Sequence, residues 1–324
     1  MRAIVVDETT RDLRVAEVTT PQPAPGEVLV KVAAAGVNRA DLMQRRGLYP
    51  PPPGISDIMG LEVSGTIESL GEGVTGHAPG DAVCALIAGG GYAEYAVVPA
   101  SQLLPVPGGV DIVDAAALPE AASTVWSNLV MEGGLRSGET FLVHGGGSGI
   151  GTYAIQVAKA LGATVAATVG SEGKAQRCVE LGADIVINYR EQDFAEELAG
   201  RVDLILDIMG AKYLGPNVSA LATGGRLVII GMQGGAQGEL NIGALIGKRA
   251  RVIGTNVRNR PLTGPGSKAA IVAEVVEHVW PLVANGSVRP VISARLPLAD
   301  AEDAQALLDS PDSVGKVLLL SETS

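Results

Sequence analysis

The sequence predicts an α/β protein in which a doubly wound parallel sheet is joined to a second, β-rich domain. Three observations predict it: short β-branched segments in the first third, apolar strands alternating with helical segments in the middle, and a glycine-rich turn after the first of those strands. A chain of 324 residues is long enough for two domains with real cores. We expect one domain over 1–121, a second over 122–259, and a return of part of 260–324 to the first.

The first third consists of short segments separated by glycine and proline. They read RAIVV, EVLVKVAAAGV, EVSGTIESLG, DAVCAL and YAEYAVVP, and each is typical of a strand. The stretch YPPPPG, Tyr49 to Gly54, must be an irregular loop because its prolines exclude both helix and central strand. The tail SVGKVLLL is β-like again, which is why we expect it to rejoin the first domain.

From about residue 122 the pattern changes to alternating strands and helices. Strands are expected in TFLVHG, TVAATVG, IVINY, DLILDIMG and GGRLVIIGM, with helices near 150–161, 172–181 and 192–200. Strands that are apolar on both faces indicate a parallel sheet covered on both sides. One long helix is expected over 268–286, ending around Pro281 and Gly286.

Composition and charge exclude several classes of protein. Apolar residues make up 47% and charged residues 18%, which is typical of a globular chain. The net charge of -11 argues against a nucleic-acid partner or an anionic membrane surface, since both need clustered Lys and Arg. No secretory leader or apolar run of spanning length is expected, and two cysteines cannot build a disulfide framework, so we expect a cytoplasmic protein.

The glycine-rich turn HGGGSGIG, His144 to Gly151, poses the main functional question. A hydrolase nucleophile elbow needs G-x-S-x-G, but Ile150 occupies the place of the second glycine. The dinucleotide pattern G-x-G-x-x-G fits better, with Gly146 first, Ser148 in place of the second glycine, and Gly151 last. We therefore favour a phosphate cradle at a helix N-terminus, with a ligand-free βα turn as the alternative.

The end of the second strand indicates which dinucleotide is bound. NAD sites usually carry Asp or Glu there, but this strand ends at Gly170 and Ser171, with Lys174 one helical turn further on. A missing acid, a hydroxyl and a lysine make room for a 2′-phosphate and neutralise it. Tyr189, followed by Arg190, can close the same pocket. The sequence therefore favours NADPH, although Lys174 also fits a solvated helix lysine.

Several motifs together resemble one family. They are AAGVNRADLMQRRGLYPPPPG, GLEVSGTIESLG, PGDAV, GGGYAEYAVVP, AAALPEAASTVW, HGGGSGIG, GSEGK, INYR and GKVLLL. In these the chain resembles the zinc-free medium-chain dehydrogenase/reductase superfamily and, within it, the zeta-crystallin-like quinone oxidoreductases. The resemblance implies a GroES-like substrate domain beside a Rossmann domain, NADPH in the cleft between them, and a homodimer.

The resemblance also implies which residues surround the cofactor and the substrate. The pyrophosphate turn would be Ser148, Gly149 and Ile150, which lie between Gly146 and Gly151 of the glycine pattern. The 2′-phosphate contacts would be Gly170, Ser171, Lys174 and Tyr189. The nicotinamide half would contact Thr124, Gly231, Met232, Gly254, Thr255 and Asn256, while Asn38 and Tyr49 would lie beside both the nicotinamide ring and the acceptor.

The departures from zinc-dependent relatives predict a protein without metal. Those relatives carry G-H-E where this chain has Leu61 before Glu62, and the structural four-cysteine lobe is absent. The histidines His77, His144 and His278 lack ligand spacing, and a catalytic zinc needs three protein ligands. We expect His144 to be a packing or hydrogen-bonding residue and not a base.

Without a metal to polarise a carbonyl, the acceptor must already be electron-poor, as a quinone or activated enone is. Asn38 and Tyr49 are the candidate hydrogen-bond donors to this acceptor. The simpler alternatives are that Asn38 is a turn residue and Tyr49 an aromatic residue of the loop. No acid–base residue is assigned. Two alternatives stay open: an enoyl-thioester reductase using Arg39, Arg45 and Arg46 for phosphates, and a non-catalytic NADPH-binding sensor or structural protein.

Overall fold

The computed structural model describes residues 1–321, which divide into two compact units. Unit 1 comprises Met1–Ser123, Val257–Gly286 and the chain from Pro290 onward, and unit 2 comprises Thr124–Asn256 with Ser287–Arg289. No helix within residues 1–321 combines the length and the apolar character needed to cross a bilayer.

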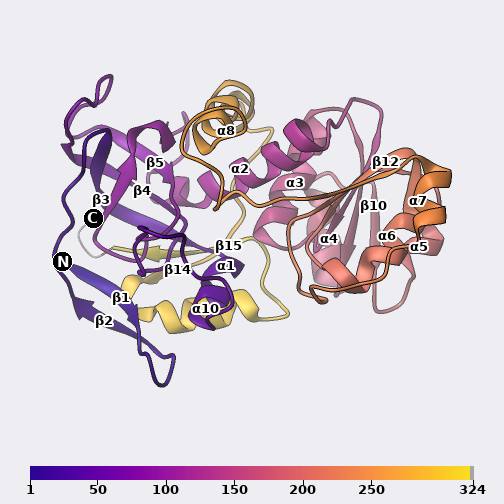
Figure 1. Cartoon of the computed structure of the whole chain (residues 1–324), viewed down its shortest axis with the longest axis horizontal. Coiled ribbons are helices and arrows are strands. Elements are labelled where there is room, and N and C mark those ends of the chain that lie inside the picture. The colour runs from indigo at the N-terminus through magenta and orange to yellow at the C-terminus, as the bar shows by residue number, and fades with distance from the viewer. Residues whose placement is uncertain (322–324) are drawn as a thin grey trace. The chain divides into compact units, whose positions relative to one another are not determined.

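Unit 1 is built on a sheet whose strand order is β14-β15-β3-β4-β5-β7, with β6 paired to β3. The strands are β3 (Glu27–Val37), β4 (Glu62–Leu70), β5 (Ala82–Leu86), β6 (Tyr95–Pro99), β7 (Leu103–Pro105), β14 (Ile292–Pro297) and β15 (Lys316–Leu320), while β1 (Arg2–Val6) and β2 (Leu13–Glu17) pair separately. Figure 1 shows the yellow C-terminal strands beside the purple β3, and β15 runs antiparallel to it with Val317 opposite Val37. The last strand thus completes the sheet of the first segment.

The helices of unit 1 come from both ends of the chain. They are α1 (Arg39–Arg45), α8 (Lys268–Glu274), the π-turn η5 (Val275–Val279), α9 (Trp280–Ala284) and α10 (Ala301–Asp309), with short 3₁₀ turns at η1 (Ala100–Gln102), η2 (Asp114–Ala117) and η6 (Leu298–Asp300). The helix α2 (Pro119–Trp126) contains the boundary between the units. The buried side chains of Met59, Ile67, Tyr92 and Val317 belong to the core of unit 1.

Unit 2 is a six-stranded parallel sheet with the order β10-β9-β8-β11-β12-β13. Its strands are β8 (Thr140–His144), β9 (Thr164–Val169), β10 (Ile185–Asn188), β11 (Val202–Asp207), β12 (Leu221–Ile229) and β13 (Arg251–Gly254). Its helical segments are η3 (Ser127–Glu132), α3 (Gly149–Ala160), α4 (Glu172–Glu180), α5 (Phe194–Glu197), η4 (Gly210–Tyr213), α6 (Leu214–Ala220) and α7 (Ile242–Lys248). This strand order is the doubly wound Rossmann order, so the predicted fold class is confirmed.

Two expected helices differ from the structure. The helix expected over 192–200 spans only Phe194–Glu197, because Asp193 caps it late and Gly200 adopts a positive φ of 69°. The helix expected over 268–286 is α8, η5 and α9 in succession. Its π-turn precedes Pro281, which has no N–H to donate to the preceding turn, and Gly286 follows the last helical residue.

One buried arginine connects four segments of unit 2. Arg226, at the start of the buried part of β12, forms two hydrogen bonds with the Glu139 carboxylate, at 2.9 and 2.8 Å. It also donates to the carbonyls of Gly133, Gly134 and Asp203. Removing this guanidinium would leave three carbonyls and one carboxylate without their partner.

We expect Arg226→Met to lower the free energy of unfolding by about 3–5 kcal/mol, because breaking a buried ion pair leaves the other charge uncompensated. Urea denaturation followed by far-ultraviolet circular dichroism measures this. The control is Arg201→Met, an exposed arginine of the same unit, which should change stability by less than about 0.5 kcal/mol. Equal effects of the two exchanges would contradict the structural role of Arg226.

Candidate active site

The glycine-rich turn joins β8 to α3 in unit 2 and exposes the start of the helix. Ser148 is the N-cap, and its side-chain oxygen accepts a hydrogen bond from the Gly151 N–H at 3.0 Å. A Cβ at Gly151 would clash with the Gly145 carbonyl, so only glycine lets the helix approach the strand this closely. The remaining amides at the start of α3 are available to an anion, as in a phosphate cradle.

The structure corrects the role assigned to the first glycine of the pattern. The residue in the left-handed conformation is Gly145, with φ 73°, and not Gly146. Gly146 is required for packing instead, because a Cβ there would lie 2.8 Å from Cys178 Sγ and 2.9 Å from Ala167 Cβ. Three glycines follow one another here, and the dinucleotide pattern aligns on the second of them, Gly146. The turn itself is made by the first, Gly145.

The residues predicted to contact a 2′-phosphate lie together at the carboxyl ends of β9 and β10. A Cβ on Gly147 would lie 3.0 Å from Lys174 Cδ, so the lysine stem lies against the phosphate turn. A Cβ on Gly170 would clash with the Tyr189 hydroxyl, so that phenol lies against the end of β9. Tyr189 is 47% exposed, and Ser171 caps α4 without using its side chain.

A cavity of about 690 Å³ opens beside this cluster, within unit 2. It is lined by residues that follow four neighbouring strands, among them Gly145 after β8, Thr168 near the end of β9, Tyr189 after β10 and Ile208 after β11. This edge is where the strand order reverses, the usual place for a ligand in a doubly wound sheet. Its volume lies in the range of small-molecule sites.

Two residues predicted for the nicotinamide half, Thr255 and Thr124, are joined through a third residue in unit 2. The Thr255 hydroxyl donates to Asn128 Oδ1 at 3.1 Å, and Asn128 Nδ2 donates to the Thr124 carbonyl at 2.7 Å. Gly254 ends β13 opposite Ile229. Asn128, buried in η3, was missed by the sequence analysis, and nothing in its local pattern signals a role.

Gly231 and Met232 follow β12, beside the end of β11. A Cβ on Gly231 would lie 2.6 Å from the Ile208 carbonyl, so glycine permits this close approach, while Met232 is 64% exposed. Asn256 is the last residue of the long segment of unit 2. These positions share the carboxyl edge of the sheet with the phosphate turn.

His144 is a buried structural residue in unit 2. Its Nδ1 lies 3.0 Å from Thr168 Oγ1 and its Nε2 lies 2.7 Å from Asn217 Oδ1. Its ring contacts those of Phe194 and Tyr213 edge-on. Burial lowers the pKa of His144 to about 4, against the opposing effect of the hydrogen bond that His144 donates to Asn217. A neutral imidazole with both nitrogens engaged is a packing residue, as the sequence analysis expected.

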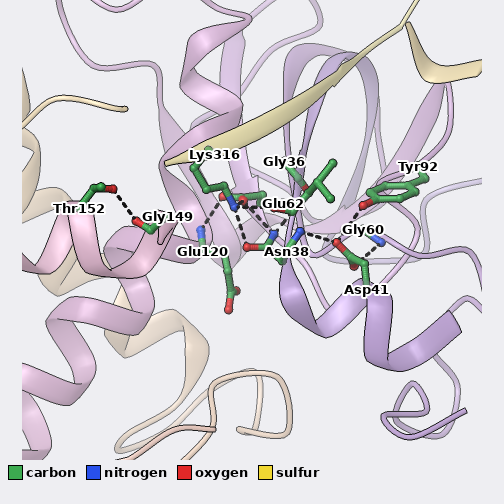
Figure 2. Close-up of polar contacts among 11 residues, drawn as sticks. Gly36, Asn38, Asp41, Gly60, Glu62, Tyr92, Glu120, Gly149, Thr152 and Lys316 are labelled. Carbon is green, nitrogen blue, oxygen red and sulfur yellow. Dashed lines mark hydrogen bonds and ion pairs between the residues drawn. The ribbon is translucent and has the colours of Figure 1, made fainter. Parts of the chain in front are cut away.

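Asn38 is held in unit 1 by a buried ion pair (Figure 2). Lys316, on β15, forms an ion pair with Glu62 on β4, and both side chains are buried. The Lys316 ammonium also donates to Asn38 Oδ1 at 2.6 Å, while Asn38 Nδ2 donates to Glu62 Oε1 at 2.9 Å. Glu62 Oε2 in turn accepts from the Glu120 backbone N–H at 2.9 Å.

The amide of Asn38 is therefore largely committed within its own unit. Its second N–H reaches only the Gly36 carbonyl, at a long 3.4 Å, and is the one donor that can turn toward a ligand. Nothing in the sequence indicates the Lys316–Glu62 pair, because it joins residues 254 positions apart.

A second buried carboxylate fixes the backbone around Asn38. Asp41 accepts from the Asn38 N–H at 2.8 Å, the Gly60 N–H at 3.1 Å and the Tyr92 hydroxyl at 3.0 Å, as Figure 2 shows. Burial raises the pKa of Asp41 to about 6, and these three donors and Lys316 only partly oppose that rise. The carboxylate thus anchors the start of α1.

Tyr49 lies in its proline-rich loop under a buried arginine of unit 1. The Arg258 guanidinium carbon is 5.0 Å from the centre of the Tyr49 ring, and its Nη1 donates to the Tyr49 carbonyl at 3.1 Å. Burial and the Glu120 carboxylate raise the pKa of the Tyr49 phenol, while Arg258 lowers it. The phenol therefore stays protonated and keeps its capacity to donate a hydrogen bond.

The residues do not fit a zinc site. Within residues 1–321, no three His, Cys, Asp or Glu side chains gather closely enough to hold a metal ion. Leu61 is buried beside Glu62, whose carboxylate is bonded to an ammonium and two N–H groups. We therefore derive no step that passes through zinc.

Two family models and many relatives match this chain. Residues 24–108 match the alcohol dehydrogenase GroES-like domain and residues 149–272 match the zinc-binding dehydrogenase family. This chain belongs to the medium-chain dehydrogenase/reductase superfamily, among the quinone oxidoreductase relatives. Members of this superfamily are oxidoreductases with a GroES-like domain and a Rossmann-type NAD(P)-binding domain, and the predicted family is confirmed.

Three relatives illustrate the match. The quinone oxidoreductase of Rattus norvegicus is 32% identical over 94% of this chain and 92% of its own. The acryloyl-coenzyme A reductase of Metallosphaera sedula is 31% identical over 98% of this chain and 99% of its own. The solved structure of the Escherichia coli quinone oxidoreductase complexed with NADPH is 30% identical, covers 98% of this chain and 99% of its own, and has a TM-score of 0.87.

The lowered pKa of His144 makes a prediction about stability. The unfolded imidazole takes up a proton near pH 6.5 and the native one only near pH 4, so acidification favours the unfolded state between these values. From pH 7.5 to 5 this group should remove about 2 kcal/mol of stability.

Urea denaturation of the wild type and His144→Gln at both pH values isolates this effect. Burial raises the pKa values of Asp41 and Asp207 to about 6, so acidification stabilises the native state through these two groups. Their contribution is the same in both proteins and cancels in the stability difference. The stability difference between wild type and variant should shrink by about 2 kcal/mol at pH 5. A difference that is constant with pH would show that the native histidine titrates normally.

Proposed function

We propose that this protein reduces a quinone or an activated enone with NADPH and without zinc. The observation that carries the proposal is the end of β9, where Gly170 and Ser171 stand in place of an acid. The Lys174 stem lies against the phosphate turn, and the Tyr189 phenol lies against Gly170. A carboxylate there would hold the two ribose hydroxyls of NAD, whereas a lysine and a phenol suit a 2′-phosphate.

Glu172 is an acid that directly follows Ser171 in this cluster. It is the first residue of α4, where a carboxylate is favoured by the helix dipole, and it is exposed. Its position gives it a structural explanation that does not require a ribose contact.

The residues of unit 2 fit the cofactor in three places. The amides after Ser148 would hold the pyrophosphate, the cavity beside Tyr189 would take the adenosine, and Thr124 and Thr255 would border the nicotinamide. When bound, this cofactor supplies a hydride. The protein's own contribution is to orient the cofactor, exclude water and offer hydrogen bonds where charge develops.

Tyr49 is the stronger candidate for contact with the acceptor in unit 1. Its phenol is protonated and its ring is held from behind by Arg258, so it presents both a flat wall and an O–H donor. Asn38 is a weaker donor than the sequence suggested, because only its long contact to Gly36 is easily exchanged. The proton that completes the reduction has no assigned donor.

An enoyl-thioester reductase is the second candidate, because a relative of this size is named acryloyl-coenzyme A reductase. That function would need a basic surface for the phosphates of the thioester carrier. Arg39 and Arg46 form ion pairs with Asp309, and Arg45 forms one with Glu302. These three guanidiniums face two carboxylates, Asp309 and Glu302, which offset most of the positive charge that a phosphate site would need. A homodimer and a cytoplasmic location remain predictions.

The cofactor proposal is tested at Lys174. We expect Lys174→Ala to raise the dissociation constant for NADPH by about 10- to 100-fold and to leave that for NADH unchanged, because one charge-assisted bond to the 2′-phosphate is lost. Fluorescence titration with both nucleotides measures this. Lys159→Ala is the control, since Lys159 pairs with Asp184 at the far end of α3. An unchanged preference of Lys174→Ala for NADPH over NADH would refute the assignment of Lys174 to the 2′-phosphate.

The acceptor proposal is tested by following NADPH oxidation with 1,2-naphthoquinone, 1,4-naphthoquinone and crotonyl-coenzyme A. We expect turnover of quinones and little of the thioester, since the three arginines are paired. Thioester turnover exceeding that of both quinones would favour the second candidate. Tight NADPH binding without turnover of any acceptor would favour a sensor or structural protein.

A further inference from the structure

One buried arginine of unit 1, Arg258, contacts three segments that are far apart in the sequence. The residue is 5% exposed. Its Nε donates to the Ala88 carbonyl at 2.8 Å, its Nη1 to the Tyr49 carbonyl at 3.1 Å, and its Nη2 to Gln44 Oε1 at 2.6 Å. These oxygens belong to the turn after β5, the proline-rich loop and α1. A planar guanidinium fixes the directions of all three bonds, which a flexible ammonium does not.

The proline-rich loop depends on contacts from outside itself. It has neither helix nor strand from Tyr49 to Asp57. Pro50 to Pro53 carry no N–H, so this part of the loop cannot donate backbone hydrogen bonds. An internal bond runs from the Ile55 N–H to the Pro52 carbonyl at 3.1 Å. The path of the loop is therefore set largely by side chains that reach it from neighbouring segments.

Gln44 extends the hold of Arg258 to the far end of the loop. While its Oε1 accepts from Arg258, its Nε2 donates to the Asp57 carbonyl at 3.0 Å. A side-chain amide can do both because it carries an acceptor and two donors. The guanidinium thus acts directly on the first residue of the loop, Tyr49, and through one amide on the last, Asp57.

The contact with Ala88 fixes the surface against which the loop packs. Gly89 follows Ala88 in the chain. A Cβ on Gly89 would lie 2.8 Å from the Ser56 carbonyl oxygen and 2.9 Å from Ile55 Cγ2. The second half of the loop therefore lies directly on the turn whose carbonyl Arg258 binds.

Tyr49 is the residue whose place depends most on these contacts. The Arg258 guanidinium carbon is 5.0 Å from the centre of the Tyr49 ring, and Nη1 of the same group binds the Tyr49 carbonyl. One group therefore fixes both the ring and the backbone of this residue. A ring held in this way is preorganised, because a ligand that stacks on it does not first have to order the loop.

We propose that Arg258 is a positioning residue that holds both ends of the proline-rich loop, with Gln44 as the relay, and keeps Tyr49 as a preformed wall for the acceptor. This inference rests on the proposed function, in which Tyr49 contacts the acceptor. Arg258 acts through Tyr49 and not by contact with the acceptor. Burying a cation among neutral oxygens costs free energy, so the geometry that the guanidinium imposes explains its presence better than stability does.

Steady-state kinetics of Arg258→Lys with NADPH and 1,4-naphthoquinone test the proposal. The exchange keeps the cation but loses the three fixed bonds of the guanidinium. We expect the KM for the quinone to rise about tenfold and kcat to fall by less than about threefold, because the acceptor must now order the loop when it binds. The dissociation constant for NADPH should change by less than about twofold, since the residues proposed to hold its phosphates belong to unit 2.

Hydrogen–deuterium exchange of residues 49–57, measured by mass spectrometry without any ligand, reports on the loop directly. We expect its amides to exchange at least about fivefold faster in Arg258→Lys than in the wild type. Arg295→Lys is the matched control, because the Arg295 guanidinium also forms two hydrogen bonds in unit 1 but donates both to Asp114 in η2. It should change neither the exchange of the loop nor the KM for the quinone.

Gln44→Glu separates the two ends of the loop, and it also serves if Arg258→Lys does not fold. A carboxylate keeps the contact with Arg258 but loses the N–H that the Asp57 carbonyl accepts. We expect faster exchange at residues 55–57 and a smaller rise in the KM for the quinone than in Arg258→Lys. In the double variant the two increases in KM should combine to less than their product, because both act through one relay.

Three results would overturn the proposal. They are loop exchange that is unchanged in Arg258→Lys, faster exchange without any rise in the KM for the quinone, and a rise in KM that Arg295→Lys shares. Faster loop exchange in Arg258→Lys, together with a wild type that reduces no quinone, would leave the hold on the loop standing and refute the proposed function. Quinone turnover with unchanged loop exchange would do the reverse.

Discussion

The buried ion pair between Lys316 and Glu62 is the interaction on which unit 1 depends. Removing two charges from water costs several kcal/mol for each, and only complete hydrogen bonding offsets that cost. Here the pair engages Asn38 after β3 and the Glu120 N–H at the start of α2. The same two charges therefore hold three segments together: the C-terminal strand β15, the long strand β3 and the start of α2.

Unit 2 depends on a different constraint, which is close approach of backbone to backbone. Gly145 makes the turn, Gly151 lets α3 reach the strand, and Gly231 lets the end of β12 reach Ile208. Because glycine has no side chain, these three positions leave space at the carboxyl edge of the sheet. The edge is consequently both the place where the chain needs glycine and the place where a dinucleotide finds amides and room.

The sequence predicts the elements whose signal is local. The apolar runs of β8, β9 and β11 and the amphipathic patterns of α3 and α4 give these elements within a few residues of their ends. The strand β13 and the helix α7 were missed. The four-residue β10 was predicted because its residues IVIN are almost all apolar, whereas β13 begins at a charged arginine and α7 contains two glycines. Side-chain partners are harder still, because Lys316 with Glu62 and Arg258 with Tyr49 meet only after the chain has folded. The role given to Gly146 was wrong for a related reason, since letters alone do not show which glycine has a positive φ.

The ammonium beside Glu62 also restricts how this lineage can change. A Leu61→His exchange would supply an imidazole next to Glu62, but a divalent ion recruited there would meet a positive charge fixed in a dry interior. Gly36 closes another route, because any side chain at that position would displace the Glu62 carboxylate. A metal site beside Glu62 would therefore need the Lys316 charge removed as well as a ligand added, because the ammonium already occupies the carboxylate.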